Sequence, residues 1–298
     1  MKKILLFLSF ILIFAYGCSD KGRTIKHKSI LLDLFYGMEF DKIKSVYVDS
    51  VLDTIPGLKH FEFEKKWYYT GCNDYNVSCH TYLGIYIDSI IPGNIWQNLQ
   101  PVINKNFAEH ISYDAPFDSI YANEIAEFVP TPMDYAKKWE NLMDKFSETM
   151  KPTMIDSVYQ EITHLRVCGV VHKIFEDNDW ETYIIEFSFS YHGGCGCPSY
   201  ADYITFNRHD GHQLTENEIL SKYDKVKLET QLETGLGNAK IENGFDPIGG
   251  PNEYTDNLFG ASGIALIDNG VLIYFQPYVA GCGAEGQYNI IINNSELK

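Results

Sequence analysis

The chain has 298 residues, of which 45% are hydrophobic, 14% aromatic and 21% charged. This composition is that of a packed globular protein, and it excludes a disordered chain, a coiled coil and a collagen-like fibre. Forty acidic side chains against 24 basic ones leave a formal net charge of −16. Because the nucleic-acid backbone is densely negative, this charge argues against a nucleic-acid partner.

Residues 1–17 have the pattern of a secretory signal peptide. Lys2 and Lys3 give the segment a positive start, and residues 4–16 form an apolar run. The run is shorter than the roughly 20 residues that a membrane-spanning helix needs. We therefore expect the segment to be removed after export, which takes the formal charge from −16 to −18.

Cys18 follows this segment directly. The sequence Ala-Tyr-Gly-Cys at residues 15–18 resembles a bacterial lipobox, in which the cysteine is lipidated and becomes the mature N-terminus. We expect a lipid anchor in a bacterial membrane, with the folded part in the cell envelope and facing the periplasm or the exterior. The alternative is a plain signal peptide cut near Gly17.

Six further cysteines remain, an even number that favours disulfides in an oxidising compartment: Cys72, Cys79, Cys168, Cys195, Cys197 and Cys282. Cys72 and Cys79 close a polar turn and are the easiest pair. Cys195 and Cys197 are too close to pair without strain, so at least one should pair with Cys282 or Cys168. A metal site is the alternative, because His80, His192, His209 and His212 lie near these thiols, but the spacing matches no zinc pattern.

The first half of the chain alternates strand and helix patterns. Residues 61–69 and 82–87 read as strands on either side of the Cys72–Cys79 turn. Pro101 is predicted to open a short helix. A longer helix runs from Pro132, with Thr131 as its cap, and is expected to end at Pro152. Its apolar stripe predicts a core-facing side, formed by Trp139, Leu142, Met143, Phe146 and Met150.

The second half is richer in strands. Residues 163–175, 183–191 and 203–206 read as strands, the second with the alternation of a strand that buries only one face. A helical stretch is predicted over about 216–236. Asn269-Gly270 between two apolar runs predicts a β-hairpin, and residues 288–292 read as a last strand.

These elements predict an α+β protein of two subdomains, with mainly antiparallel sheets packed against helices. The expected division is a signal peptide over 1–17, a tether over 18–40, an N-terminal subdomain over 41–155 and a C-terminal domain over 156–298.

A short pattern of Asp, Ser or Thr, and an aliphatic residue recurs five times where composition predicts roughly one: Asp49-Ser50-Val51, Asp53-Thr54-Ile55, Asp88-Ser89-Ile90, Asp118-Ser119-Ile120 and Asp156-Ser157-Val158. It resembles the O-glycosylation acceptor of secreted Bacteroidetes proteins. The alternative is that Asp-Ser marks the starts of strands and helices.

Three stretches of the second half form a recognisable set: Tyr191-His192-Gly193-Gly194, Tyr203-Ile204-Thr205-Phe206 and Gly211-His212-Gln213-Leu214. A fourth stretch is Gly270-Val271-Leu272-Ile273-Tyr274-Phe275-Gln276-Pro277-Tyr278, followed by Gly286. Together they resemble the RsiV-like C-terminal domain, which occurs in RsiV-type anti-sigma factors and beside PdaC-type polysaccharide deacetylases. The resemblance covers residues from about 163 to 298.

The resemblance implies a binding surface formed by these motif residues. In the RsiV relatives the domain binds lysozyme, a strongly basic protein that an acidic surface would attract. Cys195, Cys197 and Cys282 fall in two loops of the family, which implies that these loops are tied to each other. Val279 departs from the family, which often has Glu at that place.

No catalytic signature accompanies these motifs. The chain contains no G-x-S-x-G, Walker loop or H-E-x-x-H. We expect no cofactor, no metal and no catalytic residue. The sequence predicts a non-catalytic envelope lipoprotein that binds a basic protein or a cell-wall glycan. The alternative is an enzyme acting on cell-wall glycan through paired carboxylates that the sequence does not place.

Overall fold

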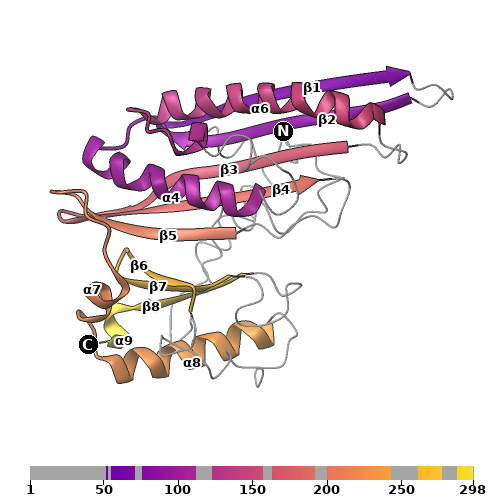
Figure 1. Ribbon diagram of the computed structural model, residues 1–298. Coiled ribbons are helices and arrows are strands. Elements are labelled where there is room, and N and C mark those ends of the chain that lie inside the picture. Colours follow the sequence, from indigo (N-terminus) through magenta and orange to yellow (C-terminus); the bar gives the residue numbers. More distant parts are fainter. Residues whose placement is uncertain are drawn as a thin grey trace, which may run out of the picture.

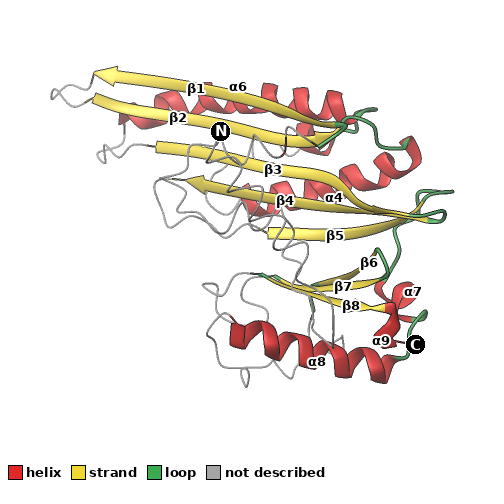
Figure 2. Cartoon of the chain, turned by 180° about the vertical axis from the view of Figure 1, so that it is seen from behind, coloured by secondary structure: helices red, strands yellow, loops and turns green. Residues whose placement is uncertain are grey.

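Two β-sheets organise the residues that the structure, a computed structural model, describes: residues 52, 55–70, 76–111, 123–156, 163–191, 200–242, 261–276 and 287–297. The larger sheet has five strands in the order β1 (Leu58–Thr70), β2 (Asn76–Asp88), β3 (Thr163–Glu176), β4 (Trp180–Tyr191) and β5 (Tyr200–Asn207). The smaller sheet has β6 (Gly263–Ile267), β7 (Gly270–Phe275) and β8 (Tyr288–Asn293). Figures 1 and 2 show the two sheets from opposite sides.

The labelled helices of the described residues are α4 (Gly93–Ile111), α6 (Pro132–Asp156), α7 (Glu216–Leu220), α8 (Lys225–Glu242) and α9 (Asn294–Leu297), and residues 123–126 form a further short helical turn. Together with the two mainly antiparallel sheets they confirm the predicted α+β class. None of them is both long and apolar enough to cross a membrane.

One strand pair of the larger sheet is parallel. β2 pairs with β3 in parallel from Cys79↔Thr163 to Ile87↔Val171. The other three strand pairs of this sheet, β1 with β2, β3 with β4 and β4 with β5, are antiparallel. A parallel pair needs a crossover connection, and α4 and α6 lie within it. The boundary expected near residue 155 therefore falls inside this sheet, because β1 and β2 precede it and β3 to β5 follow it.

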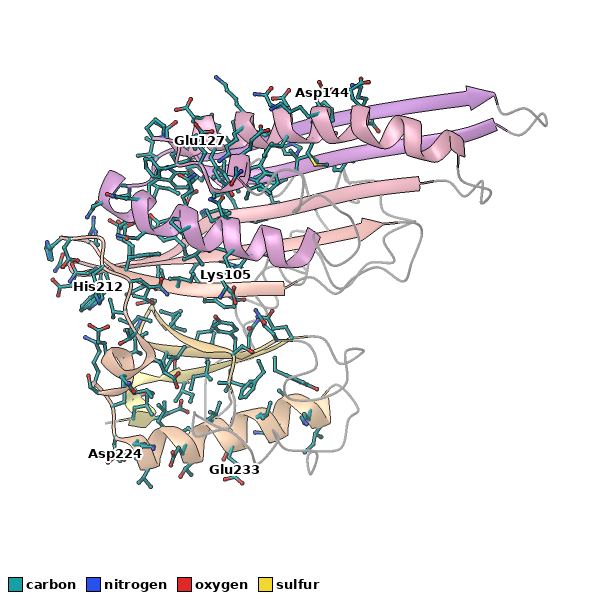
Figure 3. The ribbon with its side chains drawn as sticks, viewed as in Figure 1. Lys105, Glu127, Asp144, His212, Asp224 and Glu233 are labelled. Atoms are coloured by element: carbon teal, nitrogen blue, oxygen red, sulfur yellow. The ribbon has the colours of Figure 1, made fainter. Side chains whose placement is uncertain are left out.

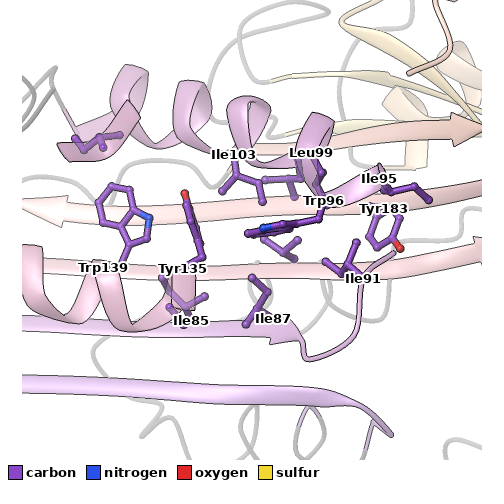
Figure 4. Close-up of a cluster of buried hydrophobic side chains, with 14 of the residues drawn as sticks. Ile85, Ile87, Ile91, Ile95, Trp96, Leu99, Ile103, Tyr135, Trp139 and Tyr183 are labelled. Carbon is purple, nitrogen blue, oxygen red and sulfur yellow. The ribbon is translucent and has the colours of Figure 1, made fainter. Parts of the chain in front are cut away.

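α4 and α6 cover one face of the larger sheet. Trp96 of α4 and Trp139 of α6 are fully buried between these helices and Ile85 and Ile87 of β2. Figure 4 shows Tyr135 beside both indole rings, and its ring meets that of Trp96 edge-on at 5.5 Å between centroids. Of the predicted helical stripe, Trp139, Leu142 and Met143 are buried as expected, and the side chains of Phe146 and Met150 lie outside the described residues.

The smaller sheet packs on the opposite face of the larger one. Ile184 of β4 and Tyr203 of β5 contact Leu272 and Tyr274 of β7 in one buried cluster. The alternation in β4 predicted one solvent face. That prediction is wrong for the part described, because the second sheet covers it and leaves Glu186 only 2% exposed.

Two buried threonines join the sheets by hydrogen bonds. Thr182 of β4 donates its hydroxyl to the Leu266 carbonyl at 2.6 Å, and the Leu266 N–H donates to Thr205 Oγ1 at 2.9 Å. Because Thr182 spends its only hydroxyl hydrogen on Leu266, the 2.8 Å bond between the threonines has Thr205 as its donor. The backbone of β6 at Leu266 is thus satisfied by side chains of the larger sheet.

α8 covers the outer face of the smaller sheet with Leu228, Leu232 and Leu236. The order of layers is therefore α4 and α6, the larger sheet, the smaller sheet, and α8.

Two predicted helix ends are wrong, both at prolines. α4 begins eight residues before Pro101 and continues through it, and α6 continues through Pro152 to Asp156. A proline inside a helix costs about 3 kcal/mol because it removes one backbone hydrogen bond. In α4 the burial of Ile95, Leu99 and Ile103 on one face outweighs that cost.

The predicted helical stretch over 216–236 is divided. Thr215 caps α7, whose last turn ends at Ser221, and Asp224 then caps α8 by accepting from the Lys227 N–H at 3.0 Å. A second N-cap within the stretch starts a new helix axis. The predicted hairpin is confirmed, but its two-residue turn is Asp268-Asn269, one residue earlier than predicted, because Ile267 pairs with Gly270; Asn269 has a φ of 58°.

Gly211 occupies a position that no other residue fits. Its φ is +76°, and a Cβ built on it would lie 2.2 Å from the backbone oxygen of Asn94. We expect Gly211→Ala to lower the free energy of unfolding by about 2 kcal/mol or more, measured by urea denaturation of the full chain. Gly237→Ala in α8 is the matched control, because a Cβ there meets nothing within 4 Å. It should stabilise the chain by about 0.5–1 kcal/mol, and equal losses for both variants would contradict the expectation.

Candidate functional site

Many of the predicted site residues lie outside the described residues: Cys18, Cys72, His192, Gly193, Gly194, Cys195, Cys197, Pro277, Tyr278, Cys282 and Gly286. Tyr191 and Cys79 are placed in β4 and β2 by their backbones only. Cys168, on β3, is the one cysteine whose side chain the structure describes, and it is partly buried. The disulfide pairings therefore stay predictions.

The four described aromatic residues of the family motifs are buried. Phe206 is fully buried on the face of the larger sheet that α4 and α6 cover, and Phe275 on the face of the smaller sheet that α8 covers, so their rings have no surface to offer a ligand. Tyr203 and Tyr274 are 3% and 5% exposed, and their rings meet edge-on at 5.2 Å between centroids. The structure thus brings two motifs together, 71 residues apart in sequence, through the contact between β5 and β7.

Asp202 is the centre of a polar group beside this tyrosine pair. Its Oδ2 accepts from Asn106 Nδ2 of α4 at 2.6 Å. Its Oδ1 accepts from Gln276 Nε2 at 2.7 Å and from the Tyr274 hydroxyl at 3.2 Å. We call Asn106, Asp202, Tyr274 and Gln276 the Asp202 cluster.

The position of β5 explains how these elements meet. β5 is an edge strand of the larger sheet, so a side chain on it can be reached both from α4 and from the smaller sheet. Asp202 lies near the start of β5, and Gln276 directly follows the end of β7. Figure 3 labels Lys105, the residue before Asn106, on α4 close to β5.

Two more carboxamides extend the cluster along the edge of β5. Gln287 accepts from the Ala201 N–H and donates to the Ala201 carbonyl, both at 3.0 Å. It also donates to Asn289, whose Nδ2 donates to the Tyr203 hydroxyl at 3.1 Å. Gln287 therefore bonds to β5 as a neighbouring strand would, which blocks further strand pairing at Ala201.

The described strand ends beside the Asp202 cluster are also the points where the unplaced motif segments attach. Residues 192–199 connect to Tyr200, and residues 277–286 connect Gln276 to Gln287. Burial and the nearby Asp202 carboxylate raise the pKa of the Tyr274 hydroxyl, so this group is a hydrogen-bond donor at every physiological pH.

A second polar group lies at the other end of the larger sheet, around Arg208. Glu181 is only 1% exposed, and its carboxylate accepts from Arg208 Nε at 3.1 Å and from the Tyr183 hydroxyl at 2.6 Å. Lys173 Nζ lies 3.8 Å from the same carboxylate. Glu176 pairs with both cations, at 2.6 Å from Arg208 Nη2. We call these five residues the Arg208 cluster.

Each charged side chain of the Arg208 cluster has a partner of opposite charge. The hydrogen bond that Glu176 accepts from Lys173 holds the pKa of the Glu176 carboxyl below its usual range. Burial, and then the bond to Glu181, raise the pKa of the Tyr183 hydroxyl. Two carboxylates thus face two cations, and Glu176 is held in its ionised form, which suits a structural clamp better than proton transfer.

His209 and His212, two of the four histidines of the metal alternative, face different carboxylates. His209 Nε2 lies 3.2 Å from Asp179, and His212 Nε2 lies 3.2 Å from Glu218, whose pKa falls to about 2 mainly through hydrogen bonds from Thr215. Figure 3 shows His212 at the exposed end of the sheet. Within the described ranges, no three His, Cys, Asp or Glu side chains gather as a metal site would need.

One copy of the repeated Asp-Ser pattern is described in full, residues 88–90. Asp88 ends β2 and accepts from the Lys173 N–H at 2.7 Å, and His172 Nδ1 lies 2.8 Å from its other oxygen. Ile90 is 87% exposed. Here the aspartate of the pattern holds the end of β2 to β3 by hydrogen bonds instead of starting an element. Glycosylation of the pattern stays a prediction.

Sequence reasoning missed Asn106 and Asp202. Gln276 lies inside a quoted motif and Asp202 directly precedes one, so proximity to the motifs was a usable signal for these two. Nothing in the sequence links Asn106 to Asp202, 96 residues later.

No family model matches the chain, and no curated protein matches it. Among solved structures, the chain is similar to a DUF3298 family protein from Pseudomonas aeruginosa PAO1, with 11% identity over 80% of this chain and 92% of that one and a TM-score of 0.45. It is also similar to a DUF3298 family member from Bacteroides fragilis NCTC 9343, with 11% identity over 80% and 91% and a TM-score of 0.41. These structural neighbours are DUF3298 family proteins, and neither is an RsiV-type protein by its description.

Proposed function

We propose that the chain is a non-catalytic lipoprotein of the cell envelope that binds a protein or glycan ligand at the surface around the Asp202 cluster. The observation that carries the proposal is the meeting of α4, β5, β7 and β8 in one partly exposed polar group. The unplaced motif segments 192–199 and 277–286 attach beside it.

The proposed cellular location follows from the first residues of the chain. The signal-like segment over 1–17 and Cys18 support export and a lipid anchor. The net charge supports attraction of a basic partner, with an association rate that falls as salt is added.

Two described carboxyl groups, Glu176 and Glu218, do not have the protonation behaviour that an enzyme acting on cell-wall glycan needs in its general acid. Such an enzyme needs one carboxylic acid whose pKa is raised so that it can protonate the leaving group. The pKa values of Glu176 and Glu218 both fall instead. Glu176 is also fixed in ion pairs with Lys173 and Arg208.

A single experiment on membranes tests both parts of the proposal. Cells expressing the full chain or Cys18→Ala are fractionated, and each fraction is titrated with hen lysozyme and with soluble peptidoglycan fragments at about 0.05 M and about 0.5 M NaCl. We expect the wild-type chain in the membrane fraction and Cys18→Ala in the soluble fraction, each able to bind at least one of the two ligands.

The proposal fails if Cys18→Ala stays in the membrane fraction, or if neither ligand binds the wild-type chain at either salt concentration.

A further inference from the structure

We propose that the Asp202 cluster recognises an uncharged sugar unit of a glycan through two carboxamides that Asp202 holds in place. This inference rests on the proposed function and chooses between its two ligand classes. The choice follows from the hydrogen-bond capacity, the charge and the burial of the cluster.

The hydrogen-bond capacity comes from Asn106 and Gln276. A carboxamide has two N–H donors and one carbonyl acceptor. Each of the two spends one N–H on Asp202, one on each carboxylate oxygen. Each therefore keeps a second N–H and its carbonyl oxygen within the described structure, and both side chains are partly exposed.

Such a donor and acceptor side by side match the neighbouring hydroxyls of a sugar, because each hydroxyl both donates and accepts. Asp202 fixes the two carboxamides on either side of itself, so their orientation is set before a ligand arrives. Groups that are ordered in advance lose less conformational entropy on binding.

The charge of the cluster separates a sugar from a basic protein. The three bonds that Asp202 accepts come from neutral donors: a carboxamide on one oxygen, and a carboxamide and a phenol on the other. A basic partner binds best to carboxylates that keep room for a cation. An anionic ligand would need a cation, and the donors on Asp202 are all neutral. The hydrogen-bonding groups that the cluster still offers are neutral carboxamides, so an uncharged ligand fits them.

The burial of the tyrosines limits the strength of the interaction. Tyr203 and Tyr274 are too buried to stack on a sugar ring. Instead, the Tyr203 hydroxyl accepts from Asn289 and the Tyr274 hydroxyl donates to Asp202. Among the described residues, recognition therefore rests on hydrogen bonds, each of which adds little affinity on its own. One sugar unit should bind weakly, and a polymer with repeated units should bind more tightly through multivalency.

The test uses the full lipidated chain in a detergent without sugar, such as a polyoxyethylene ether. Calorimetric titrations with chitohexaose, cellohexaose and maltohexaose at about 0.05 M and about 0.5 M NaCl measure Kd for the wild type, Asn106→Ala and Gln276→Ala. Asn98→Ala is the matched control, because Asn98 is also a hydrogen-bonded asparagine of α4 but bonds to Gly211, away from the cluster. Thermal unfolding of each variant shows whether it stays folded.

We expect at least one oligosaccharide to bind with the same Kd at both salt concentrations. Asn106→Ala and Gln276→Ala should each weaken it about tenfold while the chain stays folded at the temperature of the titration, and Asn98→Ala should leave it within about twofold.

Sugar binding that both cluster variants leave unchanged would overturn the inference. Salt-dependent binding of lysozyme with no oligosaccharide bound would also overturn it, while leaving the proposed function intact. Failure of lysozyme, peptidoglycan fragments and oligosaccharides alike would overturn both.

Discussion

Trp96→Ala is expected to lower the free energy of unfolding by about 4 kcal/mol. The indole is fully buried between α4, α6 and the larger sheet, and its Nε1 donates to the Val129 carbonyl at 2.8 Å. Figure 4 shows it lying between Ile91 and Tyr135, so truncation would leave a cavity lined from several elements. The lost hydrogen bond adds to the cost because the Val129 carbonyl loses its donor.

Urea denaturation of the full chain, followed by circular dichroism, measures this loss. Phe128→Ala is the control, because this aromatic residue adjoins Val129 but is 52% exposed. It should cost less than about 1 kcal/mol. A loss for Trp96→Ala no greater than that for Phe128→Ala would contradict the packing described here.

Arg208→Ala is expected to lower the free energy of unfolding by about 3 kcal/mol. The change removes the guanidinium partner of the buried Glu181 carboxylate and leaves it only the more distant Lys173 ammonium, at 3.8 Å. The cost should come mainly from that uncompensated buried charge. Glu181→Gln removes the charge but keeps an oxygen that can accept from the Tyr183 hydroxyl. The double variant Arg208→Ala with Glu181→Gln should therefore recover most of the loss.

A double-mutant cycle from denaturation midpoints measures the coupling between the two residues. Lys145→Ala is the control, since its 2.5 Å pair with Glu124 is about half exposed on both sides. That change should cost no more than about 1 kcal/mol. Additive effects of Arg208→Ala and Glu181→Gln would show that burial of the carboxylate is not what makes Arg208 important.

The local elements could be predicted from the sequence where short-range chemistry decides them. Thr131 caps α6 by accepting from the Asp134 N–H, and the hairpin forms where it was predicted, with its turn at Asp268-Asn269. The predictions at Pro101 and Pro152 were wrong because a proline disturbs a helix locally, whereas packing along the whole helix decides whether it continues. The parallel pairing of β2 with β3 could not be predicted, since it joins residues about 84 positions apart.

The candidate site was predictable only in part. Tyr203 and Tyr274 belong to the quoted motifs, and the structure does bring them together. Their burial could not be foreseen, because whether a strand face is exposed depends on the second sheet that covers it. For the same reason the polar residues that do reach the surface, Asn106 and Gln276, were not singled out. Their position depends on the edge of β5 and not on any local pattern.

The crossover between β2 and β3 affects the order in which a nascent chain can complete its structure. When residues 58–156 have been synthesised, β1, β2, α4 and α6 are present, but the inner edge of β2 has no neighbour until β3 follows. Such an edge is prone to pair with other chains. A fragment truncated after α6 should therefore self-associate, and maturation is governed by the arrival of distant segments rather than by helix formation.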